Sequence, residues 1–372
     1  MTLPAIDLFS RSPAQVRSCL LGIGVATPQA VEQEKLLQLA LKVSCADAAQ
    51  AAWLRRVFRS SGVERRGTVL ADSVNDFYPH AESQADKGPT THARMQRYAE
   101  EAPRLAARAS RLALVDSHTS PSDITHLLTA SCTGFMAPGL DCALIESLGL
   151  KPSVRRLHIG FMGCHAAFNL LAAARDAFAA DPAARILICC TELCSLHLAY
   201  GWDPGKLIAN ALFADGAAAA VMGTNTDTVV AFPELIDSSS LLLPECADAM
   251  TWRIGDHGFE MTLSPGVPSP IRQHLRSWCE EFLASHDLKI ADIAAWAIHP
   301  GGPKILDAVG AALNLPEASL AASREILASH GNMSSATILF ILQKIFSQNL
   351  SGPCLAIGLG PGLMVEGLLF NF

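Results

Sequence analysis

Short apolar runs alternate with longer Ala/Leu-rich segments along this chain of 372 residues, and the alternation limits the folds open to it. Runs of this length are typical of strands buried on both faces, whereas the longer segments have the spacing of helices. The sequence therefore predicts an α/β fold with a mostly buried sheet. We expect strands at residues 18–26, 124–131, 155–160, 185–190, 217–222, 293–299 and 353–360, and helices at residues 92–114, 140–148, 165–179, 271–285, 303–313 and 334–346.

The chain divides into two halves that have the same general order of elements, without a residue-level repeat. Its length exceeds that of one typical domain core. Segments 224–230 and 234–249 predict an irregular zone, and the polar segment 82–91 predicts a surface loop. We place the boundary near residue 225, which gives the halves 1–225 and 226–372.

Composition excludes several classes of protein. Half of the residues are hydrophobic and 17% are charged, which indicates a large buried core rather than disorder. A formal net charge of −7 leaves no global basic field for nucleic acid. The eleven cysteines are an odd, scattered set, the first residues have no secretory signal pattern, and no apolar run reaches the length of a membrane span. We expect a soluble, cytoplasmic protein with reduced thiols and without membrane insertion.

Cys164 is the first candidate for chemistry. It follows a predicted strand and the glycines Gly160 and Gly163, and it precedes an Ala/Leu-rich helix. The N-terminus of a helix offers free backbone N–H groups and a positive dipole end, which favour thiolate and lower the pKa of a cysteine. The alternative is an inert buried cysteine, the commonest state of this residue type.

Two further polar side chains stand where predicted elements meet. His299 ends an apolar strand and precedes a Pro-Gly-Gly turn, a suitable place for a hydrogen-bond donor or base. Asn332 precedes a helix, where it is either an N-cap or a neutral amide that donates to a developing oxyanion. Papain-like proteases also have the order Cys, His, Asn, but the signature of the papain cysteine is absent around Cys164.

Two other patterns do not fit cofactor motifs. The cysteines at 189, 190 and 194 lack a second Cys/His pair at zinc-ligand spacing. The Gly-rich run 358–362 leaves too few residues after it for the helix and strand of a dinucleotide-binding motif. It predicts instead a Gly/Pro turn between two strands, with its backbone at the floor of the site.

Four motifs, in this order, resemble those of the chalcone synthase-like, type III polyketide synthases of the thiolase superfamily. They are Gly163-Cys164, His299-Pro300-Gly301-Gly302, Gly331-Asn332-Met333-Ser334 and Gly358-Leu359-Gly360-Pro361-Gly362. The resemblance covers nearly the whole chain, and segments 192–196 and 251–259 are more similar to bacterial alkylpyrone and alkylresorcinol synthases. It implies a thiolase-like five-layered αβαβα fold made of two similar halves, and a homodimer.

The resemblance also implies an acyltransferase that uses coenzyme A thioesters as substrates and needs no cofactor or metal. Cys164 takes an acyl group from an acyl-CoA, and malonyl-CoA loses carbon dioxide. His299 and Asn332 then stabilise the enolate and the tetrahedral oxyanion. Repeated condensation ends in cyclisation to a pyrone, a resorcinol or a related aromatic product. An acyl carrier protein is an alternative source of the starter.

Further positions follow from local matches to this family. Phe213 and Phe259 match the two gatekeeper phenylalanines between the CoA tunnel and the cavity. Arg55, Arg56 and Arg59 stand where the family keeps basic residues for CoA phosphates, and Arg56 is our first choice. The residues expected to line the substrate cavity are Cys132, Thr133, Cys194, His197, Met250 and Ser334.

The cavity positions distinguish this chain from plant chalcone synthases, which carry small hydroxyl residues where Cys194 and His197 stand. A fatty or other non-aromatic starter is therefore favoured, and His197 either narrows the cavity or donates a hydrogen bond to a polyketide carbonyl. Three alternatives remain at this point. They are a single-condensation β-ketoacyl synthase III or hydroxymethylglutaryl-CoA synthase, a non-catalytic thiolase-fold subunit, and a protease.

Overall fold

Nine strands form one mixed sheet through the centre of the protein. They are β1 (Ser18–Ala26), β4 (His126–Ser131), β5 (Arg155–Gly160), β6 (Ile186–Leu193), β7 (Asp215–Thr224), β8 (Glu234–Leu242), β11 (Ala295–Ile298), β12 (Pro353–Gly360) and β13 (Met364–Asn371). Their order across the sheet is β11-β12-β13-β8-β1-β7-β6-β4-β5. The computed structural model describes residues 17–81, 83, 86–225, 232–264, 266–348 and 350–372. All seven predicted strands are present in it.

Eleven helices accompany the sheet in the described part of the chain. They are α1 (Gln33–Ser44), α2 (Ala48–Arg59), α3 (Val74–Phe77), α4 (Thr91–Asp116), α5 (Leu140–Leu148), α6 (Ala166–Ala180), α7 (Pro204–Leu212), α8 (Pro268–Ala284), α9 (Pro303–Leu313), α10 (Ala321–His330) and α11 (Thr337–Phe346). Two small strand pairs lie outside the main sheet. One joins β2 (Ala30–Glu32) to β3 (Arg65–Gly67), and the other is the hairpin of β9 (Met250–Gly255) and β10 (Gly258–Leu263).

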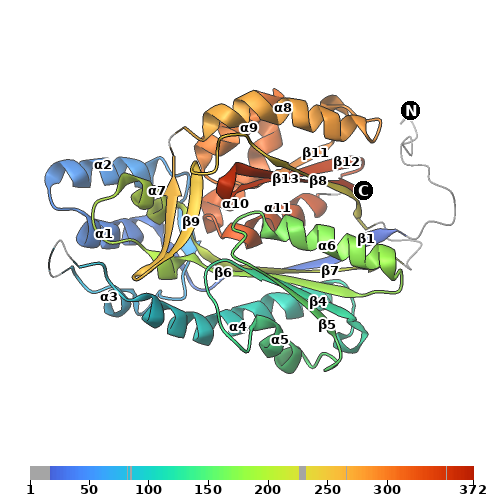
Figure 1. Cartoon of the computed structure of the whole chain (residues 1–372), viewed down its shortest axis with the longest axis horizontal. Helices are drawn as coiled ribbons and strands as arrows, with labels where there is room; N and C mark the ends of the chain where they lie inside the picture. The colour runs from blue at the N-terminus through green and yellow to red at the C-terminus, as the bar shows by residue number, and fades with distance from the viewer. Residues whose placement is uncertain (1–16, 82, 84–85, 226–231, 265, 349) are drawn as a thin grey trace.

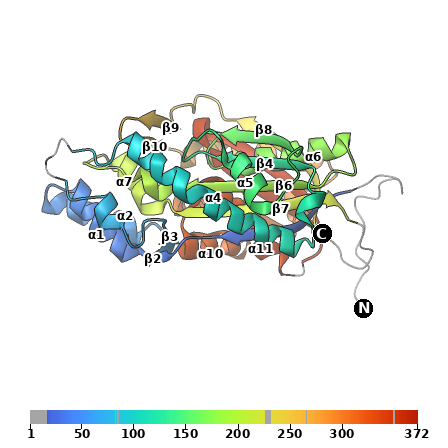
Figure 2. The same cartoon turned by 90° about the horizontal axis from the view of Figure 1, so that it is seen from below.

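These elements form five layers (Figure 1). Helices α4 and α5 cover the outer face of the part of the sheet made by β1, β7, β6, β4 and β5. Helices α8 and α9 cover the outer face of the part made by β8, β13, β12 and β11. Helices α6 and α11 lie between the two parts of the sheet. A view from below shows α4 running along the outer face of the part that contains β4, β6 and β7 (Figure 2). The expected αβαβα architecture is confirmed.

The two halves of the chain have the same strand topology. In the first half β1 and β7 are antiparallel, β7 and β6 are antiparallel, and β6 and β4 are parallel. The second half repeats this pattern in β8, β13, β12 and β11. Within the sheet, the described residues join the halves through one pair, Cys19 with Glu234. The predicted boundary at residue 225 adjoins residues 226–231, which lie outside the described residues, and it stays a prediction.

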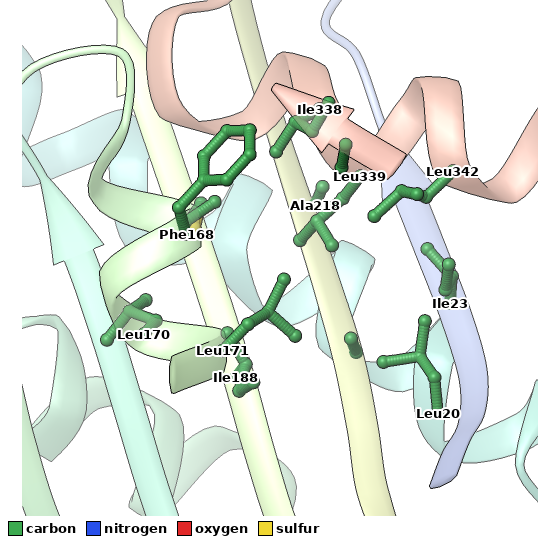
Figure 3. Close-up of a cluster of buried hydrophobic side chains, with 14 of the residues drawn as sticks. Leu20, Ile23, Phe168, Leu170, Leu171, Ile188, Ala218, Ile338, Leu339 and Leu342 are labelled. Atoms are coloured by element: carbon green, nitrogen blue, oxygen red, sulfur yellow. The ribbon is translucent and has the colours of Figure 1, made fainter. Parts of the chain in front are cut away.

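The middle layer is the largest apolar cluster, because both of its helices are covered on two sides. Phe168 and Leu171 of α6 lie near Ile338 and Leu339 of α11, with Ala218 of β7 beneath them (Figure 3). All five side chains are buried. Burying side chains of this size contributes about 1.5–3 kcal/mol each relative to exposure, so this layer is a principal source of cohesion.

One sequence-based expectation about the fold is wrong. Segment 234–249 was expected to be irregular, but Glu234–Leu242 forms β8, which pairs with β13 over eight residues. The run contains Asp237 and three serines, so it has no continuous apolar stretch that would indicate a strand. Backbone pairing with the neighbouring strand determines its conformation instead, because strand propensity depends strongly on context.

Glycine in β1 allows α4 to approach the sheet closely. A Cβ at Gly24 would lie 2.2 Å from the backbone nitrogen of Ala113 and 2.3 Å from the carbonyl oxygen of Ala109. Real Cβ atoms do not come this close to other atoms, and backbone cannot turn aside as a flexible side chain can. The helix would have to move away from the strand.

We therefore expect Gly24→Ala to lower the free energy of unfolding by about 3 kcal/mol, through overpacking. Urea denaturation monitored by circular dichroism measures the change. The control is Gly205→Ala in the first turn of α7, where a Cβ would meet only Asp203 Oδ1 at 3.4 Å. Equal stability of the two variants would contradict the close approach of α4 to β1.

Candidate active site

Cys164 lies at the N-terminal end of α6, in the middle layer. The chain leaves β5, passes Phe161 with φ 61° and Gly163 with φ 80°, and enters the helix directly after His165. A Cβ at Gly163 would lie 2.5 Å from Pro361 Cδ, so the predicted Gly/Pro turn packs against the cysteine loop. Only 4% of Cys164 is exposed. The sequence predicted this strand–glycine–helix setting correctly.

Asn332 occupies the corresponding position in the second half, shortly before α11. Its backbone N–H donates to Leu212 O and its carbonyl accepts from Ala214 N, both at 2.9 Å, so it forms a bridge with Phe213. Its side-chain Oδ1 accepts a hydrogen bond from the Ser334 N–H at 2.8 Å. This bond fixes the orientation of the amide. Nδ2 is buried and has no hydrogen-bond partner of good geometry among the described residues.

His299 follows β11 and is held by its backbone N–H, which donates to Ile357 O at 2.8 Å. Its side chain is 1% exposed, and neither ring nitrogen has a hydrogen-bond partner within the described part of the chain. Burial, with a smaller contribution from the nearby His165, lowers the pKa of His299 to about 3. The two imidazoles are therefore near one another, and His299 is neutral at physiological pH.

The thiol of Cys164 belongs to a chain of buried polar groups. Ser334 Oγ donates to Cys164 Sγ at 3.6 Å and lies 3.2 Å from Cys132 Sγ. The Cys132 thiol in turn donates to Glu192 Oε1 at 3.4 Å. Hydrogen bonds therefore connect a buried carboxyl group with the candidate nucleophile.

The charge state of Cys164 differs from the expectation. Burial and, to a smaller extent, the Glu192 carboxyl raise the pKa of the thiol, which is about 12. The hydrogen bond from Ser334 and the nearby Asn332 amide, which forms no bond of good geometry, act in the opposite direction but do not outweigh burial. The helix N-terminus was expected to give a thiolate, and this was wrong for the resting site because loss of water is the larger effect. At rest the Cys164 thiol is therefore neutral, as is the imidazole of His299.

Glu192 is the main polar residue that sequence reasoning missed. At the end of β6 it accepts from Cys132 N at 3.0 Å, from Thr133 Oγ1 at 2.8 Å and from Ser335 Oγ. It is fully buried, and burial raises its pKa. A carboxyl group in an otherwise apolar strand was the available signal, since such groups are almost never buried without partners.

A cavity of about 420 Å³ lies beside this centre. Cys194 and His197, two of the expected cavity residues, line it together with Phe213 and Phe259. The other expected cavity residues lie elsewhere. Cys132 and Ser334 belong to the chain of polar groups that ends at the Cys164 thiol. Thr133 is hydrogen-bonded to Glu192, and Met250 is buried at the start of β9.

An aromatic cluster joins the β9–β10 hairpin to the cysteine loop. The ring of Phe259 stacks on His197 at 4.3 Å and lies 5.7 Å from Phe161 and 5.8 Å from Trp252, in both cases edge to face. Phe135 is 5.9 Å from Phe259. The sequence predicted Phe259 and His197 as site residues but gave no signal for the other three, because they come from separate segments.

The predicted CoA contacts lie apart from this cavity. Arg55, Arg56 and Arg59 are exposed on the last two turns of α2 and do not line it. Arg66 and Lys206 are cations that do. Arg66 is buried and donates to the carbonyl oxygens of Phe213 and of Asn210, the latter at 2.8 Å.

The described residues contain neither a metal centre nor a disulfide. No three His, Cys, Asp or Glu side chains gather there in a way that could hold a metal ion, and all eleven cysteines are free. No described helix is long and apolar enough to cross a membrane.

The duplicated fold, with a cysteine before one central helix and an asparagine before the other, defines a thiolase-fold acyltransferase. Family comparison gives the finer assignment. The profile "Chalcone and stilbene synthases, N-terminal domain" matches residues 8–226, and "Chalcone and stilbene synthases, C-terminal domain" matches residues 234–371. The chain belongs to this family, the type III polyketide synthases.

Curated relatives and solved structures agree with this assignment. "Alpha-pyrone synthesis polyketide synthase-like Pks18" of Mycobacterium tuberculosis (strain ATCC 25618 / H37Rv) is 32% identical over 97% of this chain and 92% of the relative. "1,3,6,8-tetrahydroxynaphthalene synthase" of Streptomyces peucetius subsp. caesius is 32% identical over 93% and 90%. The crystal structure of PKS-I from the brown alga Ectocarpus siliculosus has a TM-score of 0.90 at 30% identity, covering 97% of this chain and 100% of that one.

Family membership excludes two of the alternatives that the sequence left open. The chain is a polyketide synthase and an acyltransferase, so the protease and the non-catalytic subunit are wrong. The roles of individual site residues are not given by these comparisons and are argued below.

The lowered pKa of His299 predicts a measurable pH dependence of stability. The unfolded chain takes up a proton near pH 6.5, whereas the folded site stays neutral to about pH 3. The unfolded state therefore binds more protons, and stability is lost as the pH falls. From about pH 8 to about pH 5 the wild type should lose about 2 kcal/mol relative to His299→Gln.

Urea denaturation of both proteins at the two pH values measures this difference. Replacement of the exposed His80 by Gln is the control, for which no comparable change is expected. A constant difference between wild type and His299→Gln over this pH range would contradict the neutral, buried imidazole.

Proposed function

We propose that Cys164 carries the growing acyl chain as a thioester, and that His299 and Asn332 stabilise the negative charge that develops during condensation with malonyl-CoA. One observation carries the proposal. Asn332 Nδ2 and both nitrogens of His299 are buried without a partner among the described residues. Buried polar atoms are rarely unpaired, and such exceptions are typical of sites that await a ligand. A carbonyl oxygen of the substrate supplies the missing partner.

The first step loads the starter. When the acyl-CoA enters, the Cys164 thiol passes its proton to the neutral His299. The resulting thiolate attacks the acyl-CoA carbonyl. The new C–S bond forms as the bond to the CoA sulfur breaks, and the CoA thiolate takes the proton back. The high pKa of the resting thiol keeps it protonated and unreactive until its proton passes to His299.

The second step forms the carbon nucleophile. Malonyl-CoA loses its carboxylate as carbon dioxide, and the electron pair of the broken C–C bond moves to the thioester oxygen as an enolate. The neutral imidazole of His299 and the Asn332 amide each donate one hydrogen bond to that oxygen. The bond from the Ser334 N–H to Asn332 Oδ1 sets the orientation of the amide in advance, and the backbone bond of His299 fixes the position of its main chain at the end of β11.

The third step extends the chain. The enolate carbon attacks the thioester on Cys164, the tetrahedral oxyanion accepts the same donors, and the cysteine leaves as the new C–C bond forms. The product, a β-ketoacyl-CoA, returns to Cys164 for the next cycle. Cyclisation to a pyrone, resorcinol or related ring ends the sequence. One relative is named for α-pyrone synthesis, which supports this class of product.

The gate and the substrates follow from the surroundings of the site. Phe213 lies opposite Asn332 in a β-bridge made by the backbone of its two neighbours, and Phe259 stacks on His197 in the cavity wall, which supports gatekeeper roles for both. Exposed arginines of α2 remain our choice for the CoA phosphates. A fatty or other non-aromatic starter is proposed, delivered by CoA, with a carrier protein as the alternative donor. No metal or prosthetic group takes part in these steps, and the cytoplasmic location stays a prediction.

A homodimer is also proposed. β5 is the last strand at one edge of the sheet, and most of its side chains are exposed. Leu157 on this strand is 44% exposed, and Phe135 and Met162 near the ends of β4 and β5 are also large exposed apolar residues. An edge strand with exposed apolar side chains is a template for pairing with a second copy about a twofold axis.

The catalytic roles predict a separation of two activities. Cys164→Ala should make no condensed product yet still decarboxylate malonyl-CoA, because the enolate is held by the other two side chains. Asn332→Ala should lose decarboxylation by about 100-fold or more, as expected for one oxyanion donor. Carbon dioxide release and mass spectrometry of products from short, long and aromatic acyl-CoAs measure both.

Cys279→Ala, a buried cysteine of α8, is the matched control and should condense like the wild type. Condensed product from Cys164→Ala would refute the covalent role of Cys164. One extension only, with every starter, would favour a single-condensation enzyme over an iterative one.

The proposed homodimer predicts that a charge on β5 will change the oligomeric state. Leu157→Lys should convert a dimer into a monomer in light scattering after size exclusion, because it places a charge in a pairing edge. Leu350→Lys, at another exposed apolar residue, is the control and should leave the mass unchanged. A monomeric wild type would overturn the proposed assembly.

A further inference from the structure

His197 lines the cavity, yet both of its ring nitrogens are already bonded to the protein. Nδ1 accepts from the Phe259 backbone N–H at 2.9 Å, and Nε2 lies 2.7 Å from Thr133 O. An N–H can only donate and a carbonyl can only accept, so the ring must be neutral with its proton on Nε2. His197 therefore has no donor left for a polyketide carbonyl, and that part of the sequence-based expectation is wrong.

The hairpin that carries Phe259 depends on such contacts for its position. β9 and β10 pair only with each other among the described strands, so no ladder of the main sheet holds them. The bond from the Phe259 N–H to His197 ties the hairpin to the turn after β6, and a bond from Trp252 Nε1 to Cys132 O at 2.7 Å ties it to the end of β4. The turn at the tip of the hairpin is held separately by Thr91 at the start of α4, whose N–H donates to Asp256 O at 2.8 Å and whose hydroxyl donates to Gly255 O.

The ring of His197 also supports the ring of Phe259 directly. The two rings are stacked at 4.3 Å with 14° between their planes, and Trp252 meets the edge of the imidazole at 5.6 Å. On its other side Phe259 contacts Phe161, which lies in the loop before Cys164. The phenyl ring is therefore confined between the imidazole and the loop of the nucleophile.

We propose that His197 is a positioning residue that holds the Phe259 gate at one fixed width. The inference rests on the proposed gatekeeper role of Phe259 and adds what keeps that gate in place. A fixed gate restricts the size of molecules that reach Cys164 and keeps water from the thioester between condensations. A released gate admits bulkier reagents and lets water hydrolyse short intermediates.

The two bonds of His197 can be removed one at a time. In His197→Asn the side-chain Oδ1 takes the place of Nδ1 and can still accept from the Phe259 N–H. In His197→Gln the amide nitrogen takes the place of Nε2 and can still donate to Thr133 O. His197→Phe keeps a ring for stacking but has neither bond. His286→Asn, a bonded histidine after α8, is the control.

The first readout is access to Cys164, which does not require condensation. Purified proteins are treated with iodoacetamide, a small reagent, or with N-phenylmaleimide, a bulky one. Peptide mass spectrometry follows Cys164 separately from Cys132 and Cys194. The measured quantity is the rate of Cys164 modification by N-phenylmaleimide divided by the rate with iodoacetamide. We expect this ratio to rise about tenfold in the Gln and Phe variants, the effect of losing one buried hydrogen bond. The Asn variant keeps the bond to Phe259 but loses the stacked ring, so its ratio should rise less, and the control should stay near the wild-type ratio.

The second readout is the product profile with malonyl-CoA and an accepted starter. The Gln and Phe variants should release more hydrolysed short intermediates and show a raised KM for malonyl-CoA with a smaller change in kcat. A merely structural role would instead lower thermal stability and activity together, with the wild-type profile retained, and that result would overturn the proposal.

The two hypotheses fail in different ways. An unchanged rate ratio in all three variants, or an equal rise in the Asn variant, would refute the role of His197 whatever the enzyme produces. A wild type that condenses nothing would refute the proposed function, and the rate ratio would still decide whether His197 holds the gate.

Discussion

The packing of two helices between two parts of one sheet is the constraint on which the rest of this structure depends. α6 and α11 are buried on both sides, so their directions are fixed by the apolar layer around them. The residues just before them, Cys164 and Asn332, are therefore held in place by the core rather than by loops. Sites supported on rigid elements keep their geometry better than sites on loops. Here the core and the catalytic centre share the same two helices.

That constraint also explains the electrostatics. A centre inside the core has little water, so the pKa of the thiol rises and the pKa of the imidazole falls. Charge appears only when a substrate brings an acceptor for the unpaired donors. The buried Glu192 accepts hydrogen bonds from five donors of the surrounding segments and so holds them in place. Its position beside the nucleophile also raises the pKa of the thiol.

The sequence predicted the parts of the site that depend on local pattern. Cys164 and His299 follow strands at glycine turns and Asn332 precedes a helix, and each of these settings is visible in a few consecutive residues. The aromatic cluster was not predictable, because Phe161, Trp252 and Phe135 come together only in the fold. The sign of the thiol pKa shift was missed for a related reason. A helix N-terminus can be seen in sequence, whereas the depth of burial cannot.

The weak strand pairing between the two halves determines how the stability of their contact should change with temperature. Since one strand pair joins the two parts of the sheet within the described residues, contact across the middle layer is largely apolar. Apolar cohesion weakens on cooling, unlike the hydrogen-bonded ladders within each half. Cold should therefore loosen the union of the halves before it affects either half. An active centre assembled from both would lose its geometry first, while most secondary structure remained.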